Sequence, residues 1–116
     1  MKIVEKKEVQ YYKSKDDKCP YIEWRSTLDM KTQAILASRI SRLELGNLGF
    51  VENLGEGVHE LKIDFGPGLR IYFGNMHGSL VIILAGGPKG TQSEDIAAAK
   101  LYWKDWKARY GASYAK

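Results

Sequence analysis

The chain has 116 residues, a formal net charge of +4 and a single cysteine, which excludes an intramolecular disulfide and the four-ligand cysteine patterns of zinc sites. No apolar run approaches the roughly 18 residues of a membrane span, and the charged start of the chain is unlike a secretory signal peptide. We therefore expect one cytoplasmic domain over residues 1–116 with no membrane partner, and the basic balance favours a polyanionic ligand.

The first elements that the sequence predicts are a strand near residues 3–12 and a charged, turn-like connector over residues 13–18. Pro20 then favours the start of a short helix, because the missing N–H of proline costs nothing in the first helical turn. The spacing of its apolar residues places three of them on one face: Tyr21, Trp24 and Leu28.

A second helix is predicted from Asp29, a good N-cap, to about Leu45, with Gly46 ending it. Arg39 and Arg42 are expected to point away from its buried stripe, where they either contact RNA or keep the helix surface polar. The stripe itself is predicted to contain Leu36, Ile40 and Leu43.

The Gly-Pro-Gly connector at residues 66–68 is the most informative segment, because two runs that alternate apolar and polar residues flank it. This pattern predicts an antiparallel hairpin with residues 66–68 as its loop. A strand period of two then sorts the side chains onto two faces. On the apolar face we expect Phe65 opposite Leu69, Ile63 opposite Ile71, and Leu61 opposite Phe73. On the polar face we expect Asp64 beside Arg70, Lys62 beside Tyr72, and Glu60 beside Gly74.

After the hairpin, residues 80–85 are apolar on both faces, which predicts a central strand covered on both sides. Residues 86–90 read as a loop, and residues 91–94 have the spacing of a capping box. The closing helix is predicted to bury a stripe of Ile96, Ala99, Trp103, Trp106 and Tyr110. The expected fold is therefore α+β, in the order β-α-α-β-β-β-α, with helices on one side of an antiparallel sheet.

Several of these segments together resemble the RelE/ParE toxin superfamily, and most closely its phage-derived, HigB-like addiction module killer proteins. The resemblance is carried by residues 39–49, 54–63, 65–73 and 86–92, with a first-helix lead-in at residues 20–24. Two positions depart from the pattern. The family usually has arginine where this chain has Lys62, and an acidic or polar residue where it has Pro88.

The resemblance implies a toxin of a type II toxin–antitoxin pair that acts as a ribosome-dependent mRNA endonuclease without a cofactor. It also implies a small helix-turn-helix antitoxin as partner, which forms a heterotetramer with the toxin in some systems. Two alternatives stay open: a non-catalytic inhibitor of DNA gyrase, as in the ParE branch, and an inactive relative that only binds its antitoxin. Fold alone cannot separate these functions.

Metal-free RNA cleavage needs a base for the 2′-hydroxyl, positive charge around the phosphorane and an acid for the leaving oxygen. The resemblance implies that Arg70 is the first candidate for the phosphate contact, because arginine at the matching strand position is catalytic in related nucleases. Its alternative role is a surface ion pair with Asp64. Lys89, Lys62 and Tyr72 are the other catalytic candidates, although the lysines also fit solvated positions and the tyrosine a packed sheet position. Candidate contacts to RNA or the ribosome are Arg39, Arg42 and Gln92, and no metal ligands are predicted.

Overall fold

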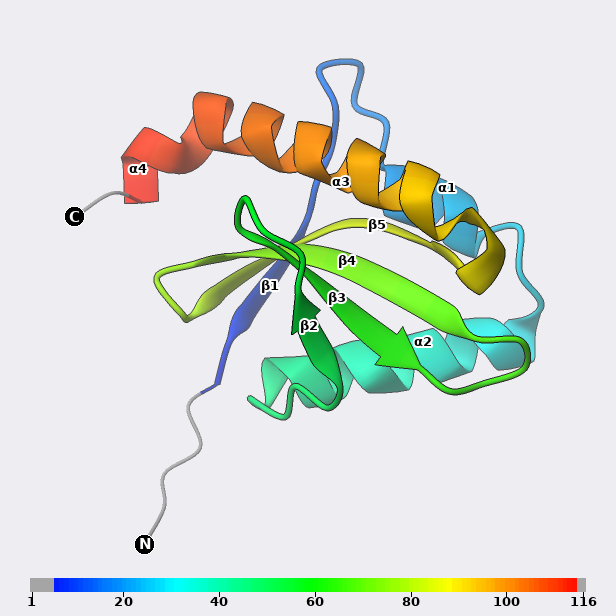
Figure 1. Ribbon diagram of the computed structural model, residues 1–116. Helices are drawn as coiled ribbons and strands as arrows, with labels where there is room; N and C mark the ends of the chain where they lie inside the picture. The colour runs from blue at the N-terminus through cyan, green and yellow to red at the C-terminus, as the bar shows by residue number, and fades with distance from the viewer. Residues whose placement is uncertain (1–5, 115–116) are drawn as a thin grey trace, which may run out of the picture.

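Five strands form one sheet in the order β1-β5-β4-β3-β2 in the computed structural model, which describes residues 6–114 (Figure 1). The pairing of β1 with β5 is parallel and the other three pairings are antiparallel. The sheet is therefore mixed, and the prediction of an antiparallel sheet is wrong at this edge. The strands are β1 (Glu8–Tyr11), β2 (Val51–Asn53), β3 (Val58–Ile63), β4 (Leu69–Met76) and β5 (Leu80–Pro88).

Three of these strands differ from the sequence prediction. The strand β5 continues through Gly86 and Gly87 to Pro88, so the prediction of a loop over residues 86–90 is wrong at its start. The first strand begins only at Glu8, and the predicted residues 3–5 lie outside the described part of the chain. The short strand β2 was missed, because three residues in a glycine-spaced segment carry too little periodicity to indicate a strand. The order of the main elements is thus β-α-α-β-β-β-β-α.

Helices cover both faces of the sheet, so the prediction of helices on one side only is wrong. Figure 1 shows α2 (Met30–Glu44) below the sheet and α3 (Gln92–Trp106) above it. The short helix α1 (Pro20–Arg25) belongs to the α2 side, where Tyr21 joins the core. A 3-10 turn η1 (Lys89–Thr91) precedes α3, and a π-helical turn η2 (Lys107–Gly111) and α4 (Ala112–Tyr114) follow it.

The two-sided cover follows from β5, whose described side chains are buried on both faces up to Gly87. A strand that is apolar on both faces must be covered on both. The core between the sheet and α1/α2 contains Tyr21, Leu36, Ile40, Leu43, Leu61, Ile63, Leu69, Ile71, Phe73, Val81 and Ile83. The core beneath α3 contains Tyr12, Val58, Tyr72, Leu80, Ile82, Leu84, Ala85, Ala99, Trp103 and Trp106.

The predicted helix caps and buried stripes are confirmed for α2 but only in part for α3. The Asp29 cap is confirmed, since its Oδ1 accepts a hydrogen bond from the Thr32 N–H at 2.9 Å, and the predicted stripe of α2 is buried. The capping box before α3 does not form, because the Thr91 hydroxyl instead donates to Asp95 Oδ2 at 2.6 Å. Tyr110 is 44% exposed, so the buried stripe of α3 ends at Trp106.

The β3–β4 hairpin has a longer loop than predicted. Residues 64–68 connect the strands, with a turn in which the Gly68 N–H donates to the Phe65 carbonyl at 3.0 Å. Lys62 consequently lies opposite Arg70, and Glu60 lies opposite Tyr72. The predicted pairings were wrong by two residues. Because the shift is even, every side chain that remains within β3 and β4 stays on the face that was predicted for it, while Asp64 and Phe65 move into the loop. Within residues 6–114, no helix is long and apolar enough to cross a membrane.

Candidate functional site

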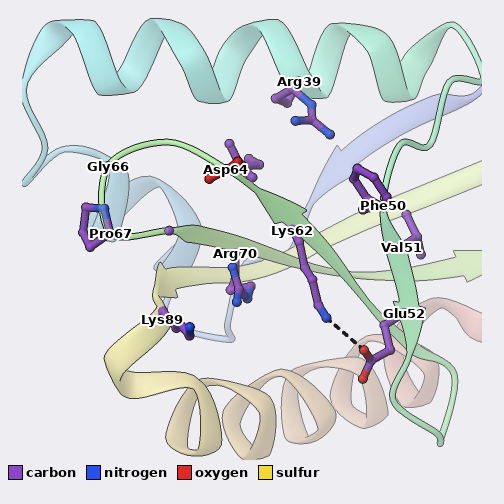
Figure 2. Close-up of a pocket in the computed structure, with 12 residues that line it drawn as sticks. Arg39, Phe50, Val51, Glu52, Lys62, Asp64, Gly66, Pro67, Arg70 and Lys89 are labelled. Atoms are coloured by element: carbon purple, nitrogen blue, oxygen red, sulfur yellow. Dashed lines mark hydrogen bonds and ion pairs between the residues drawn. The ribbon is translucent and has the colours of Figure 1, made fainter.

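A pocket of about 560 Å³ lies at the loop end of the β3–β4 hairpin (Figure 2). Four basic side chains line it, and they come from four separate parts of the chain: Arg39 from α2, Lys62 from β3, Arg70 from β4 and Lys89 from η1. Two acidic side chains, Glu52 and Asp64, also belong to the lining. The pocket is thus positively charged, and it gathers four of the seven candidate site residues.

Arg70 is held more rigidly than a surface arginine. Its side chain is 12% exposed, and its Nε lies 3.8 Å from Oε2 of Glu60. Its Nη1 also donates to the Leu69 carbonyl at 3.2 Å. The alternative role of Arg70, an ion pair with Asp64, does not form, because the longer loop places Asp64 outside the strand pairing. The partner of Arg70 is instead a carboxylate inside the protein.

Glu60 is that carboxylate, and sequence reasoning missed its importance. Its side chain is fully buried, and Oε2 accepts a hydrogen bond from Gln92 Nε2 at 2.7 Å. Among the described residues, Oε1 has no hydrogen-bond partner. The sequence did contain a signal for the burial of Glu60. The apolar stripe of α3 needed a sheet face to pack against, and the second face of the hairpin was the one left uncovered. Had α3 been placed over this face, Glu60 would have appeared as a buried acid.

Tyr72 lies across from Glu60 and is completely buried beneath α3. This burial agrees with the packed sheet position that the sequence favoured for this tyrosine, and a catalytic role for Tyr72 stays a prediction. Burial, together with the neighbouring Glu60 carboxylate, raises the pKa of Tyr72 well above its usual range. Tyr72 therefore stays protonated at neutral pH, and its ring packs in the core beneath α3.

The two lysines of the pocket are accessible to solvent. The side chain of Lys62 has an ion-pair partner, whereas Lys89 is held through its backbone. Lys62 Nζ lies 3.1 Å from Glu52 Oε1, and both side chains are exposed enough for water to screen the pair. Lys89 is exposed, and its backbone N–H donates to the Gly68 carbonyl at 3.3 Å. This bond ties the start of η1 to the hairpin loop, which keeps Lys89 near Arg70 (Figure 2).

The three predicted contacts to RNA or the ribosome separate in the structure. Arg39 is half-buried and lines the pocket, with Nη2 so close to Gly49 that an added Cβ would come within 2.6 Å of it. Arg42 is exposed on the same helix but does not belong to the described lining. Gln92 points inward and holds Glu60, so its position is structural within the site.

Both histidines lie apart from the pocket. The His59 ring stacks on Phe73 on the opposite face of the sheet, with ring centroids 5.4 Å apart, and burial lowers the pKa of His59. His77 lies in the exposed β4–β5 turn with a φ of 55°. Across residues 6–114, no group of three His, Cys, Asp or Glu side chains is arranged to hold a metal ion.

Comparison with known proteins adds one relative. No protein-family model matches the chain. A Haemophilus influenzae protein described as uncharacterized is 46% identical over 79 residues, which cover 67% of this chain and 80% of that protein. Its description names no activity, ligand or partner, so the functional assignment depends on the residues of the pocket.

Proposed function

We propose that this chain, which belongs to the same protein family as the Haemophilus influenzae relative, is a type II toxin that cleaves mRNA on the ribosome. The observation that carries the proposal is the meeting of Lys62, Arg70 and Lys89 at one pocket beside a hairpin loop. The motifs shared with the RelE/ParE superfamily support the same function, and we assign the fold to that superfamily as part of the proposal. A helix-turn-helix antitoxin is the proposed partner.

The chemistry we propose is a transesterification. The 2′-oxygen of the RNA attacks the adjacent phosphorus, the bond from phosphorus to the 5′-oxygen breaks, and a proton passes from the 2′-hydroxyl to the leaving oxygen. The products are a 2′,3′-cyclic phosphate and a 5′-hydroxyl. Negative charge grows on the phosphoryl oxygens, and fixed donors beside them stabilise the transition state most effectively.

Arg70 is the residue best suited to that stabilisation. A guanidinium offers a planar fork of donors and remains charged at every relevant pH. The Glu60 carboxylate lies 3.8 Å from Nε, too far for a hydrogen bond, and its charge favours this orientation of the guanidinium before substrate arrives. Glu60 is completely buried and does not touch substrate in this arrangement, so we assign it a positioning role together with Gln92.

Lys62 and Lys89 supply the remaining positive charge. Both are accessible, and they lie on either side of Arg70 in the pocket lining (Figure 2). An ammonium group beside the scissile phosphate neutralises its charge, and a lysine is the side chain of this set that we propose for proton transfer. The pH dependence of cleavage in Lys62→Ala and Lys89→Ala variants distinguishes which of them transfers a proton.

The test is brief induction without antitoxin, followed by primer extension on translated messages. The wild-type protein should stop growth and produce discrete cleavage sites, and Arg70→Ala should abolish both. Lys104→Ala is the matched control, since Lys104 is an exposed cation on α3 outside the pocket lining. Growth arrest with intact mRNA and loss of gyrase supercoiling would assign the chain to the ParE-like alternative. Free expression without toxicity would instead support the inactive relative.

A further inference from the structure

Phe50 is a large apolar side chain that the fold leaves in solvent. It is 80% exposed and lies at the wall of the basic pocket (Figure 2). Its backbone is nevertheless fixed, because the Lys62 N–H donates to the Phe50 carbonyl at 3.0 Å. The ring is therefore presented from a defined position without a packing role that would explain it.

The sheet places Phe50 in line with the phosphate-binding candidates. Phe50 neighbours Lys62 through that hydrogen bond, and Lys62 lies opposite Arg70 in the β3–β4 register. Adjacent strands are about 4.8 Å apart, so the backbones of Phe50 and Arg70 are separated by about 10 Å. That is the scale of one nucleotide unit, from a phosphate to the base of a neighbouring residue. In Figure 2, Lys62 stands between the other two side chains.

Exposed apolar side chains are common on protein surfaces and need no special explanation when they are scattered singly. What distinguishes Phe50 is its place: of the six large apolar side chains exposed within residues 6–114, it alone lines this pocket. The others are Tyr11, Met30, Leu45, Leu101 and Tyr110. A basic groove combined with an exposed aromatic ring is the usual arrangement for binding single-stranded nucleic acid.

We propose that Phe50 is a stacking platform for one nucleobase of a single-stranded RNA, next to the phosphate that Lys62 and Arg70 bind. This inference rests on the proposed function and adds the residue that contacts a base of the unpaired strand. A base-paired duplex keeps its bases stacked on one another and cannot offer a free face to the ring. Arg39 lies on the α2 side of the same pocket, where it provides a further cation for the strand.

The binding test uses the full chain and a short single-stranded oligonucleotide whose sugars are 2′-O-methylated, so that it cannot be cleaved. Fluorescence anisotropy at low salt should show wild-type binding, a loss of about tenfold or more for Phe50→Ala, and retention for Phe50→Trp. Leu101→Ala is the matched control, because Leu101 is a 66% exposed side chain on α3 outside the pocket. Circular dichroism melting of each variant verifies the fold.

Two further measurements separate stacking from charge. The salt dependence of binding should be unchanged in Phe50→Ala, whereas Lys62→Ala should reduce the slope by about 0.7 because one phosphate contact is lost. An oligonucleotide that lacks the stacked base should bind the wild type and Phe50→Ala equally. Equal affinity of the wild type and Phe50→Ala for the complete oligonucleotide would overturn the inference, as would the absence of any wild-type binding.

Cleavage of mRNA in cells tests the stacking role of Phe50 and the proposed nuclease function separately. If the wild type cuts mRNA and Phe50→Ala cuts it equally well at the same sites, the stacking role is overturned and the toxin assignment stands. If the wild type leaves mRNA intact while oligonucleotide binding still depends on Phe50, the stacking role stands and the proposed nuclease function falls.

Discussion

The buried carboxylate of Glu60 lies 3.8 Å from Nε of Arg70, so the cation of the proposed site is joined to an acid inside the protein. A buried charge that loses its partner is strongly destabilising. The pair therefore connects the stability of the sheet to the orientation of the guanidinium. Removing either member affects both properties, and the two effects have to be measured separately.

Arg70→Ala is expected to lower the free energy of unfolding by about 3 kcal/mol, because Glu60 then keeps only the hydrogen bond from Gln92. Adding Glu60→Gln removes the buried charge and should restore most of that loss. The double variant should still lack mRNA cleavage, since the phosphate-binding fork is absent. Urea unfolding and primer extension measure the two quantities. A double variant no more stable than Arg70→Ala would show that Glu60 is not charged against Arg70 in the folded protein.

Gly74→Ala should lower the free energy of unfolding by about 2 kcal/mol through overpacking. A Cβ at Gly74 would come within 2.4 Å of the Trp103 ring, which α3 presses against β4. Gly90→Ala is the control, since an added Cβ there meets no described atom within 4 Å, and its effect should stay under about 0.5 kcal/mol. Thermal and urea unfolding compare the variants. Equal stability would contradict the close packing of Trp103 on the sheet.

The hydrogen bond between Tyr12 and Asp105 should make the free energy of unfolding depend on pH in the alkaline range. The Tyr12 hydroxyl donates to Asp105 Oδ2 at 2.7 Å, and burial together with this bond raises the pKa of Tyr12 from 10.0 to about 12. A phenol with a raised folded-state pKa contributes stability that is complete below pH 10 and is lost as the pH rises to about 12. Tyr12→Phe should cost about 1 kcal/mol at pH 7.

The stability difference between the wild type and Tyr12→Phe is the quantity to follow, because other buried tyrosines cancel in it. It should shrink steadily through that alkaline range. A difference that stays constant would mean that the Tyr12 phenol titrates normally in the folded protein.

Glu52→Gln should tighten the binding of single-stranded oligonucleotides by a fewfold. The Glu52 carboxylate forms an ion pair with Lys62 Nζ at 3.1 Å, and it adds negative charge to the pocket wall. Its removal frees the lysine for a phosphate, while the loss of an exposed ion pair should change the free energy of unfolding by under about 1 kcal/mol. Anisotropy titrations at several salt concentrations measure the effect. Weaker binding would indicate that Glu52 orients Lys62 instead of competing with the ligand.

Local signals in the sequence predicted the parts of the fold that local physics decides. The Asp29 cap and the stripe of α2 depend on residues within one helix, and both are confirmed. The alternation around residues 66–68 sorted the hairpin faces correctly, although the turn between Phe65 and Gly68 lengthened the loop and moved the pairing by two residues.

The errors arose where distant segments meet. The parallel partner of β5 and the helix cover on the second face are set by packing across the whole chain, which single-segment patterns do not encode. Packing between distant segments also explains why part of the candidate site was not predicted. Arg70 was a candidate through the family resemblance, and Lys62 and Lys89 through residue type and position. The buried acid at position 60 became visible only once α3 lay over the hairpin.

The parallel pairing of β1 with β5 also sets the order of events during synthesis. Glu8 leaves the ribosome well before Leu80, its partner in the sheet, and antiparallel neighbours close in sequence form first. The β3–β4 hairpin can form before β5 has emerged and β1 has a strand to pair with. A nascent chain therefore acquires its Arg70 strand pairing before the sheet is closed at its other edge, and contacts of such long range slow the final folding step.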